Sequence, residues 1–329
     1  MKTRAELLKN PELLRDKARG VMVGLAVGDS FGDASRKQEN QLAYGITMDF
    51  GEGASWSTDD TEFGLLTAQT LIACKGELTK EAVAAQWMKH VVTLNGELNR
   101  GGNSEMEAAA NLRRGLMPPE SGRYNSYSTS DGAAMRAAPI GVVFAGDIAG
   151  AARAAETDAC VSHAGDGIWG AQAVACAVAA AMADAEIDEI LDAAMYAVPK
   201  DSWFYYTFNL AQQIVLDAHG AVEDAWMPLH DRLATRYKAA VPEAVSQAFG
   251  VLCLSHSEFR KGVTLAGNFG RDADTIAAIC GSILGAKFGL SGVPERWAQK
   301  TRYPSGTCLP MAKGIDLFAV ADELAALVK

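Results

Sequence analysis

The sequence predicts an all-α protein. Apolar residues recur at three- and four-residue spacing along most of the chain, which is the pattern of a helix with one buried face. Alternation of Val, Ile, Thr and aromatic residues, which is typical of strands, is almost absent. Hydrophobic residues make up 49% of the 329 residues and charged residues 21%, and no linker-like stretch divides them, so we expect one domain over residues 1–329.

Two stretches carry glycines on one helix face, near the beginning and the end of the chain. Within each stretch the glycines recur every four residues, first at Gly20, Gly24, Gly28 and Gly32 and then at Gly281, Gly285 and Gly289. On a helix this spacing lines one face and lets a neighbouring backbone approach closely. Asp29 and the shortness of the apolar runs indicate a soluble core rather than membrane packing.

The middle of the chain contains further helical patterns. They cover residues 77–94, 149–156, 187–198 and 208–219. Residues 167–182 form the most membrane-like stretch, but they are too few for a span, are rich in Ala and include Gln172. A buried helix is the better interpretation of this stretch.

Charge and cysteine usage exclude several classes of protein. Thirty Lys and Arg residues against 40 Asp and Glu give a net charge of −10, which argues against nucleic acid as a partner. Residues 1–20 are charged and lack an apolar secretory core. The six cysteines are scattered and form no CxxC pair. We expect a cytoplasmic protein with free thiols that binds neither nucleic acid nor membrane, and leave its oligomeric state open.

The first chemical motif is Ser-Thr-Asp-Asp-Thr at residues 57–61, directly before an apolar helical pattern. At a helix N-terminus the backbone is still turning, so Thr58, Asp59 and Asp60 can converge on one point. The simpler interpretation is Ser57 or Thr58 as N-cap, with the acids favoured by the helix dipole. A cap needs only one of the two carboxylates, so this stretch alone leaves both interpretations open.

A second motif near the C-terminus favours a metal site. Asp272, Asp274 and Thr275 precede another apolar helix, and Gly267 and Gly270 give the preceding turn conformational freedom. If the two helix N-termini face each other, four carboxylates meet, and they repel strongly unless a cation compensates them. All the donors are oxygens, which suits Mg²⁺, Mn²⁺ or Ca²⁺ rather than Zn²⁺. Four acids and two hydroxyls are enough for two cations.

The order of these motifs also carries a resemblance. The chain is similar to the ADP-ribosylglycohydrolase family from about residue 18 to residue 297. The stretches that carry the resemblance are residues 20–34, 57–61, 130–141, 162–175 and 267–289. Of these, the paired acidic motifs are specific, whereas the glycine stretches alone are weak.

The resemblance implies a compact orthogonal multi-helix bundle with two Mg²⁺ or Mn²⁺ ions in a cleft. The implied metal ligands are Thr58, Asp59, Asp60, Asp272, Asp274 and Thr275. Asp59 and Asp274 are the implied catalytic residues. The implied reaction is hydrolysis of an N- or O-glycosidic bond at the anomeric carbon of a ribose, with a metal-oriented water and a carboxylate as general base.

The resemblance also suggests residues that contact the substrate. They are Asp131, Gly132, Met135, Arg136, His163, Asp166, Trp169, Asn268, Phe269 and Gly270. Simpler interpretations remain for several of them. Arg136 could lie on the surface of a helix capped by Ser130 or Asp131, and Trp169 could be a core residue beside a helix-capping Asp166.

Departures from the family pattern lie in the substrate-facing motifs. Arg36 stands where many members have Glu, and Asp33 and Glu39 are the nearby acids. Asp29 is either an acid that supports the metal ligands or a buried helix-terminal residue bonded to backbone. Because the metal motifs are intact, the departures indicate hydrolysis with a changed leaving group.

Three functions agree with these observations. The first is a metal-dependent glycohydrolase acting on ADP-ribosylated protein or an ADP-ribosyl compound. The second is a hydrolase of a small ribosylated, nucleoside-like metabolite, which the acidic net charge favours slightly because ADP-ribose is an anion. The third is a non-catalytic binding or structural relative, and the intact acids of both motifs argue against it.

Overall fold

The computed structural model describes residues 1–36, 47–51, 55–256 and 258–329, and it confirms the all-α prediction. Its helices are α1 (Arg4–Leu7), α2 (Pro11–Arg36), α4 (Asp59–Ala73), α5 (Lys80–His90), α6 (Asn103–Arg113), α7 (Glu120–Arg123), α8 (Ala138–Val143), α9 (Ile148–Ala159), α10 (Asp166–Met182), α11 (Ile187–Ala194), α12 (Trp203–Asp217), α13 (Val222–Leu233), α14 (Val241–Leu254), α15 (Phe259–Gly267), α16 (Ala273–Phe288), α17 (Glu295–Thr301) and α18 (Leu317–Ala325). Short 3₁₀ helices lie at Val92–Leu94, Asp131–Ala133, Leu290–Gly292 and Pro310–Ala312. The one β feature in these ranges is an isolated antiparallel bridge between Ser130 and Ala240.

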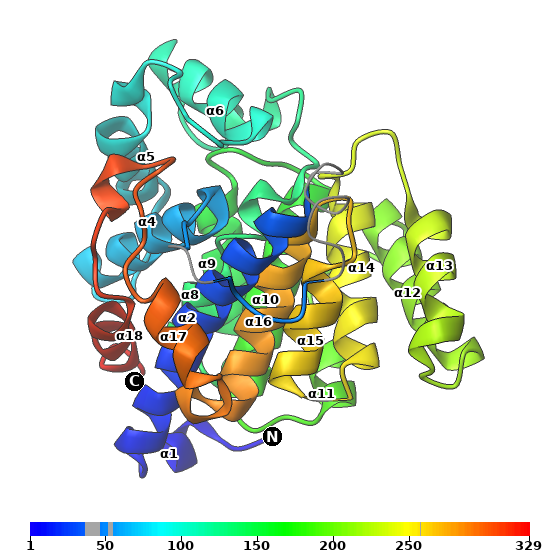
Figure 1. The fold of residues 1–329 in the computed structure, drawn as a ribbon. Coiled ribbons are helices and arrows are strands. Elements are labelled where there is room, and N and C mark those ends of the chain that lie inside the picture. Colours follow the sequence, from blue (N-terminus) through cyan, green and yellow to red (C-terminus); the bar gives the residue numbers. More distant parts are fainter. Residues whose placement is uncertain (37–46, 52–54, 257) are drawn as a thin grey trace.

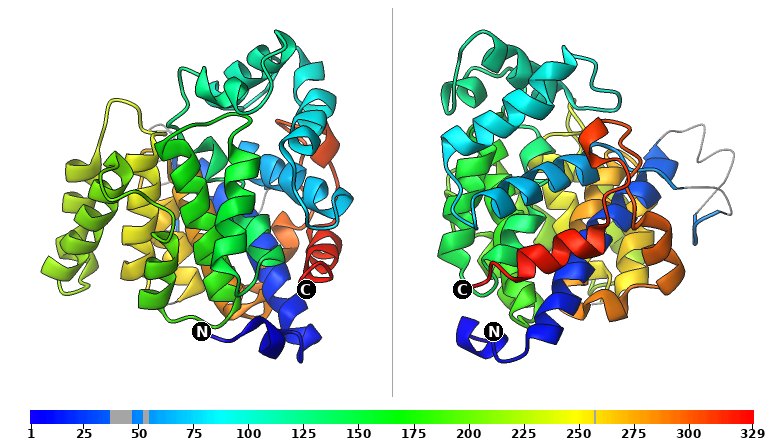
Figure 2. Two further views of the ribbon diagram at one scale, coloured as in Figure 1. Left: turned by 180° about the vertical axis from the view of Figure 1, so that it is seen from behind. Right: turned by 90° about the vertical axis from the view of Figure 1, so that its left-hand side faces the viewer.

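The helices surround a central group formed by α2, α10 and α16 (Figure 1). Helix α10, predicted as a buried helix, is buried along nearly its whole length and packs against α8, α9, α11 and α16. Helices α12 and α13 lie on one side of this group, α4 and α5 lie on the other, and α6 lies above it at the top of the view (Figure 1). Figure 2 shows α18 running across α2, so that neighbouring helices differ widely in direction.

Most predicted helices form, with shifted ends. Residues 208–219 belong to α12, which begins earlier, at Trp203, after Ser202 accepts a capping hydrogen bond from the N–H of Tyr205. The predicted helix over 77–94 ends at His90, and a 3₁₀ turn follows over Val92–Leu94. None of the described helices is long and apolar enough to span a bilayer.

The two glycine-bearing helices pack against each other. A Cβ atom placed on Gly24 would lie 2.0 Å from the carbonyl oxygen of Gly281, and one on Gly285 would lie 1.9 Å from that of Gly20. Further along α2, a Cβ on Gly32 would lie 2.2 Å from the carbonyl oxygen of Ala273, at the start of α16. The backbones of α2 and α16 are therefore in direct contact, which confirms the close approach that the spacing predicts.

We expect Gly24→Ala to lower the free energy of unfolding by about 2 kcal/mol or more, because overpacking against rigid backbone typically costs 1–3 kcal/mol. This cost outweighs the ~1 kcal/mol that Ala gains over Gly inside a helix. Urea denaturation of both proteins measures the difference. Gly51→Ala is the control outside the helices, since a Cβ there meets no atom of the described residues within 4 Å. Equal midpoints for Gly24→Ala and the unsubstituted protein would contradict the close helix contact.

Candidate metal and active site

A carboxylate from α2 holds the first turn of α4. Asp29 accepts hydrogen bonds from the backbone N–H groups of Thr58 (2.9 Å) and Thr61 (3.2 Å) and from both hydroxyls, that of Thr58 at 2.6 Å. These are donors that a capping side chain normally satisfies, and Thr58, the N-cap residue, makes no capping bond. Asp29 therefore bonds to backbone groups, as in the interpretation of it as a buried helix-terminal residue. It lies inside α2, however, and not at the end of that helix.

Burial raises the pKa of Asp29 to about 6, and the hydrogen bonds from Thr58 and Thr61 oppose that rise. Because Asp29 does the capping, neither Asp59 nor Asp60 is needed for it. Helix capping therefore does not explain why two carboxylates, those of Asp59 and Asp60, follow Thr58.

The N-termini of α4 and α16 face each other, as the paired motifs predict. One carboxylate oxygen from each of Asp59, Asp60 and Asp274 lies within 4.8 Å of the other two, and all three residues are buried. Burial raises the pKa of Asp60 well above its ordinary value, and the charge of Asp274 raises it further. Three buried carboxylates at this separation form a site of concentrated negative charge.

Asp272 stands at the N-cap of α16, after a left-handed turn. Gly270 and Arg271 have φ angles of +80° and +57°. The Arg271 guanidinium donates two hydrogen bonds to the fully buried carboxylate of Glu243, at 2.5 and 2.9 Å, and so holds the turn in place. The Asp272 carboxylate lies 2.9 Å from the ammonium of Lys238, which compensates part of the local negative charge.

Asp59, Asp60 and Asp272 line a cavity of about 40 Å³, which is room for a few water molecules, and Asp274 lies beside it in the cluster. Its lining is Asp59, Asp60, Gly102, Ser104, Glu105, Ser130, Asp131, Gly132, Met135, Tyr237, Ala239, Asp272 and Thr275. The Ser130–Ala240 bridge brings the segments around Asp131 and Tyr237 together, with the N–H of Asp131 donating to the carbonyl of Ala239 at 2.8 Å.

The donors in this cavity fit a hard divalent cation. They are carboxylate and hydroxyl oxygens, the ligands that Mg²⁺ and Mn²⁺ prefer. Among the described residues, Oδ1 of Asp60 and Oδ2 of Asp131 are buried oxygens without a hydrogen-bond partner. Burial and the charge of Asp272 raise the pKa of Asp131 well above its ordinary value. A cation would compensate these buried oxygens, which otherwise carry an uncompensated desolvation cost.

Some of the predicted metal and substrate residues line the cavity, and others lie behind the residues that line it. Asp131, Gly132 and Met135 line the cavity. Thr58 lies behind it, with its hydroxyl bonded to Asp29. Thr275 lines the cavity on the α16 side.

Arg136 and His163 lie behind the cavity wall. Arg136 is fully buried, and its guanidinium donates to Asp158 at 2.8 Å and lies over the ring of Trp87. The surface position considered for Arg136 is therefore wrong, because buried partners surround the charge. His163 is buried between two serines, and burial together with Arg136 lowers its pKa well below its ordinary value.

Asp166 and Trp169 do not line the cavity. Asp166 begins α10, and its carboxylate accepts a hydrogen bond from the N–H of Phe204 at 3.0 Å, at the start of α12. Trp169 packs against the hydrophobic core. This placement agrees with the interpretation of Trp169 as a core residue beside a helix-capping Asp166. The helix whose N-terminus Asp166 binds is α12, however, and not its own helix α10.

Asn268, Phe269 and Gly270 form the connection between α15 and α16, and they too lie outside the cavity lining. The Asn268 amide exchanges two hydrogen bonds with the backbone of Thr47, at 2.7 and 2.8 Å. The ring of Phe269 packs against Trp226, with centroids 4.9 Å apart.

The acids near Arg36 are only partly described. Arg36 ends α2, and Glu39 lies outside the described residues. Asp33 is buried, and its carboxylate accepts a hydrogen bond from the indole N–H of Trp56 at 2.6 Å. It also forms an ion pair with the guanidinium of Arg100. Its carboxylate therefore holds the segment before the first acidic motif.

The sequence interpretation missed several residues in or beside the cavity. Ser104 and Glu105 follow a pair of glycines and lie in the first turn of α6, and this spacing was the one available signal for them. Tyr237 and Lys238 lie in the connection between α13 and α14 and belong to no motif. The structure alone brings these residues beside the acids.

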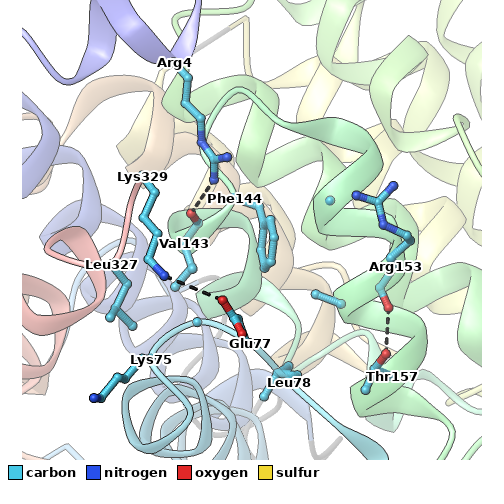
Figure 3. Close-up of a pocket in the computed structure, with 13 residues that line it drawn as sticks. Arg4, Lys75, Glu77, Leu78, Val143, Phe144, Arg153, Thr157, Leu327 and Lys329 are labelled. Atoms are coloured by element: carbon cyan, nitrogen blue, oxygen red, sulfur yellow. Dashed lines mark hydrogen bonds and ion pairs between the residues drawn. The ribbon is translucent and has the colours of Figure 1, made fainter.

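A second hollow lies apart from the acidic residues (Figure 3). Its volume is about 300 Å³, and basic side chains such as Arg4 and Arg153 outnumber the single acid Glu77 in its lining. Arg4 donates to the carbonyl of Val143 at 3.1 Å (Figure 3). This second hollow shares no lining residue with the acidic cavity and contains none of the predicted metal ligands. The acidic cavity is therefore the candidate active site.

Comparison with known proteins identifies relatives over most of the chain. The family model for ADP-ribosylglycohydrolase matches residues 10–329. An uncharacterised protein of Archaeoglobus fulgidus is 33% identical over 87% of this chain and 92% of its own length. The ADP-ribosylarginine hydrolase Tri1 of Pseudomonas putida is 25% identical over 97% of this chain and 83% of its own. The protein of the same name from Serratia proteamaculans is 24% identical, over 87% and 75%.

A solved structure shares the fold. A chain of an ADP-ribosylglycohydrolase-related protein complex superimposes with a TM-score of 0.65 and 20% identity, covering 96% of this chain and 99% of that one. The arrangement of helices is therefore that of the family.

We expect Mn²⁺ or Mg²⁺ to raise the midpoint of thermal unfolding, because a ligand at one hundred times its Kd stabilises the folded state by about 2.7 kcal/mol. Asp60→Asn should abolish this increase. With chelator present, Asp60→Asn should unfold at a higher temperature than the unsubstituted protein, because the amide removes a buried charge that Asp274 repels. The control is Asp231→Asn, whose side chain is 64% exposed and which should keep the cation-dependent increase. An increase that survives Asp60→Asn would contradict this metal site.

Proposed function

Since the chain belongs to the ADP-ribosylglycohydrolase family, we propose that it is a metal-dependent glycohydrolase acting on ADP-ribosyl groups. It cleaves the bond between the anomeric carbon of the ribose and an acceptor, which is a protein side chain or a small molecule. The observation that carries the proposal is the cluster of Asp59, Asp60 and Asp274 at two facing helix N-termini.

The site is proposed to hold two Mg²⁺ or Mn²⁺ ions. The residues that would hold them come from both helix N-termini and are Thr58, Asp59, Asp60, Asp272, Asp274 and Thr275. When bound, such ions supply positive charge that orients the ribose hydroxyls and a water molecule. The all-oxygen donor set and the buried Asp60 oxygen without a partner support this assignment.

Asp59 and Asp274 are the proposed catalytic residues. One comes from α4 and the other from α16, and a carboxylate oxygen of each lies within 4.8 Å of the other, so both are near enough to accept a hydrogen bond from one water molecule. One of them takes the proton of the attacking water as general base. The concentrated negative charge also stabilises the oxocarbenium-like character that the sugar develops as its bond breaks.

ADP-ribosylarginine is the proposed first substrate. Two relatives that match most of this chain are named ADP-ribosylarginine hydrolases, which supports an arginine acceptor. Asp131, Gly132 and Met135 are the proposed contacts to the ribose, because they line the cavity beside the acids. A small ribosylated metabolite is the alternative substrate.

We expect the protein to release ADP-ribose from ADP-ribosylarginine and to stop doing so in the presence of chelator. Asp274→Ala should lower kcat by at least about 10²-fold, the usual contribution of an acid–base group. A release assay with ADP-ribosylarginine, ADP-ribosylserine and simple ribosides measures both effects, with Asp231→Asn as the control.

The pattern of substrates decides between the three functions. Release from simple ribosides alone would favour the small-metabolite hydrolase, and no release from any substrate would favour the non-catalytic relative. Turnover that neither chelator nor Asp274→Ala reduces would overturn the metal mechanism.

A further inference from the structure

The cavity contains a carboxylate that belongs to neither acidic motif. Glu105, on the first turn of α6, is 1% exposed and lines the cavity together with Asp59 and Asp131. Two glycines make room for it: a Cβ on Gly132 would lie 2.2 Å from its Oε1, and a Cβ on Gly102 would lie 2.4 Å from its Oε2. Both of its oxygens are thus closely surrounded, and the carboxylate has a fixed place in the wall.

A chain of buried hydroxyls leads to Oε2 of Glu105. The Ser104 hydroxyl donates to Oε2 at 2.8 Å, and the Ser130 hydroxyl donates to the Ser104 oxygen at 2.8 Å. Each hydroxyl has a single proton, so both protons are committed toward Glu105. Oε2 is therefore an acceptor in this arrangement.

The same chain continues through His163. Its Nε2 lies 2.8 Å from the Ser130 oxygen and its Nδ1 lies 2.7 Å from the Ser162 oxygen, which accepts from Arg136 at 3.1 Å. Because the Ser130 proton is already used, Nε2 must carry the imidazole proton and donate it. Nδ1 then accepts from Ser162, and the lowered pKa of His163 agrees with this neutral form. Every donor from Arg136 onward points toward Glu105.

This direction favours one oxygen of Glu105 as the site of a proton. Because Oε2 already accepts the Ser104 proton, we place a proton on the carboxyl group at Oε1, which leaves each oxygen with either a donor or a proton. Among the described residues Oε1 has no hydrogen-bond partner, and its nearest cation is the Arg136 guanidinium at 3.8 Å. The carboxyl group therefore presents its acidic oxygen beside Gly132, in the wall of the cavity.

We propose that Glu105 is the general acid of the site and protonates the leaving group from Oε1. This inference rests on the proposed hydrolysis and adds to it the residue that the metal cluster does not supply. Burial raises the pKa of Glu105, while Arg136 and Ser104 oppose the rise, so the group keeps its proton to higher pH than an exposed Glu. The other titratable residues in the cavity lining are Asp59, Asp60, Asp131, Asp272 and Tyr237.

The proton balance of the reaction is complete with this residue. The bond from the anomeric carbon to the acceptor atom breaks, and its electron pair stays on the acceptor, which takes the proton from Oε1 of Glu105. The water oxygen bonds to the anomeric carbon, and its proton passes to Asp59 or Asp274. That aspartate then releases its proton to solvent, and Glu105 takes one up, so one water is consumed and the acceptor leaves protonated. Ser104, Ser130 and His163 are positioning residues that keep Oε2 occupied.

Leaving-group dependence tests the proposal. We expect Glu105→Gln to lower kcat on ADP-ribosylarginine by about 10²-fold or more, the usual contribution of a general acid. On 4-nitrophenyl ADP-ribose, whose phenolate leaves without a proton, kcat should fall by no more than about threefold. KM should stay similar for both substrates. Glu107→Gln is the matched control on the same helix, since Glu107 binds Ser126 outside the cavity and should leave both rates unchanged.

Ser130→Ala tests the hydroxyl chain and keeps Glu105 in place, so it remains informative if Glu105→Gln fails to fold. It should lower kcat on ADP-ribosylarginine by about tenfold and spare the nitrophenyl substrate. If kcat of the variant that folds falls equally on both substrates, or falls on neither, Glu105 is not the general acid. The proposed hydrolase function would stand in that case. An unsubstituted protein that hydrolyses neither substrate would overturn the proposed function and this inference together.

Discussion

The direct contact between the backbones of α2 and α16 determines where the acidic residues meet. Helix α2 carries Asp29, which binds the first turn of α4, and three residues later Gly32, which touches the first residue of α16. Three residues of helix rise by about 4.5 Å. The N-termini of α4 and α16 are therefore held at nearly the same height on one rigid helix, and this height places Asp59 and Asp60 opposite Asp274.

Positive groups of the described residues compensate the buried carboxylates only in part. Helix N-termini carry a partial positive charge of about half a unit each, which offsets a fraction of the carboxylate charge. Lys238 compensates Asp272 from one side, and the Arg136 guanidinium, itself paired with Asp158, lies near Glu105 on the other. Natural proteins accept such local conflicts at functional sites and offset them with packing elsewhere.

Sequence reasoning succeeded where the signal was local. Spacing predicted the helices and the glycine contact, and neighbouring polar residues predicted the two acidic N-termini. It did not find Glu105, because α6 meets the cavity only through tertiary packing. The family resemblance suggested Asn268 as a substrate contact, and in the structure the left-handed turn at Gly270 and Arg271 lies between it and Asp272. A charged residue such as Arg136 could be placed on the surface or in the cleft by pattern, and buried partners decided against the surface.

The glycine contact also limits how the chain can vary. A larger side chain in a protein core is often accommodated when a second mutation shortens its neighbour. The neighbour of Gly24 is the carbonyl oxygen of Gly281, and that of Gly285 is the carbonyl oxygen of Gly20, so no smaller residue exists on either side. A second mutation therefore cannot compensate for a larger side chain at the contact between α2 and α16. Substrate specificity can change through the residues that line the cavity, while the two helices that aim the acids stay fixed.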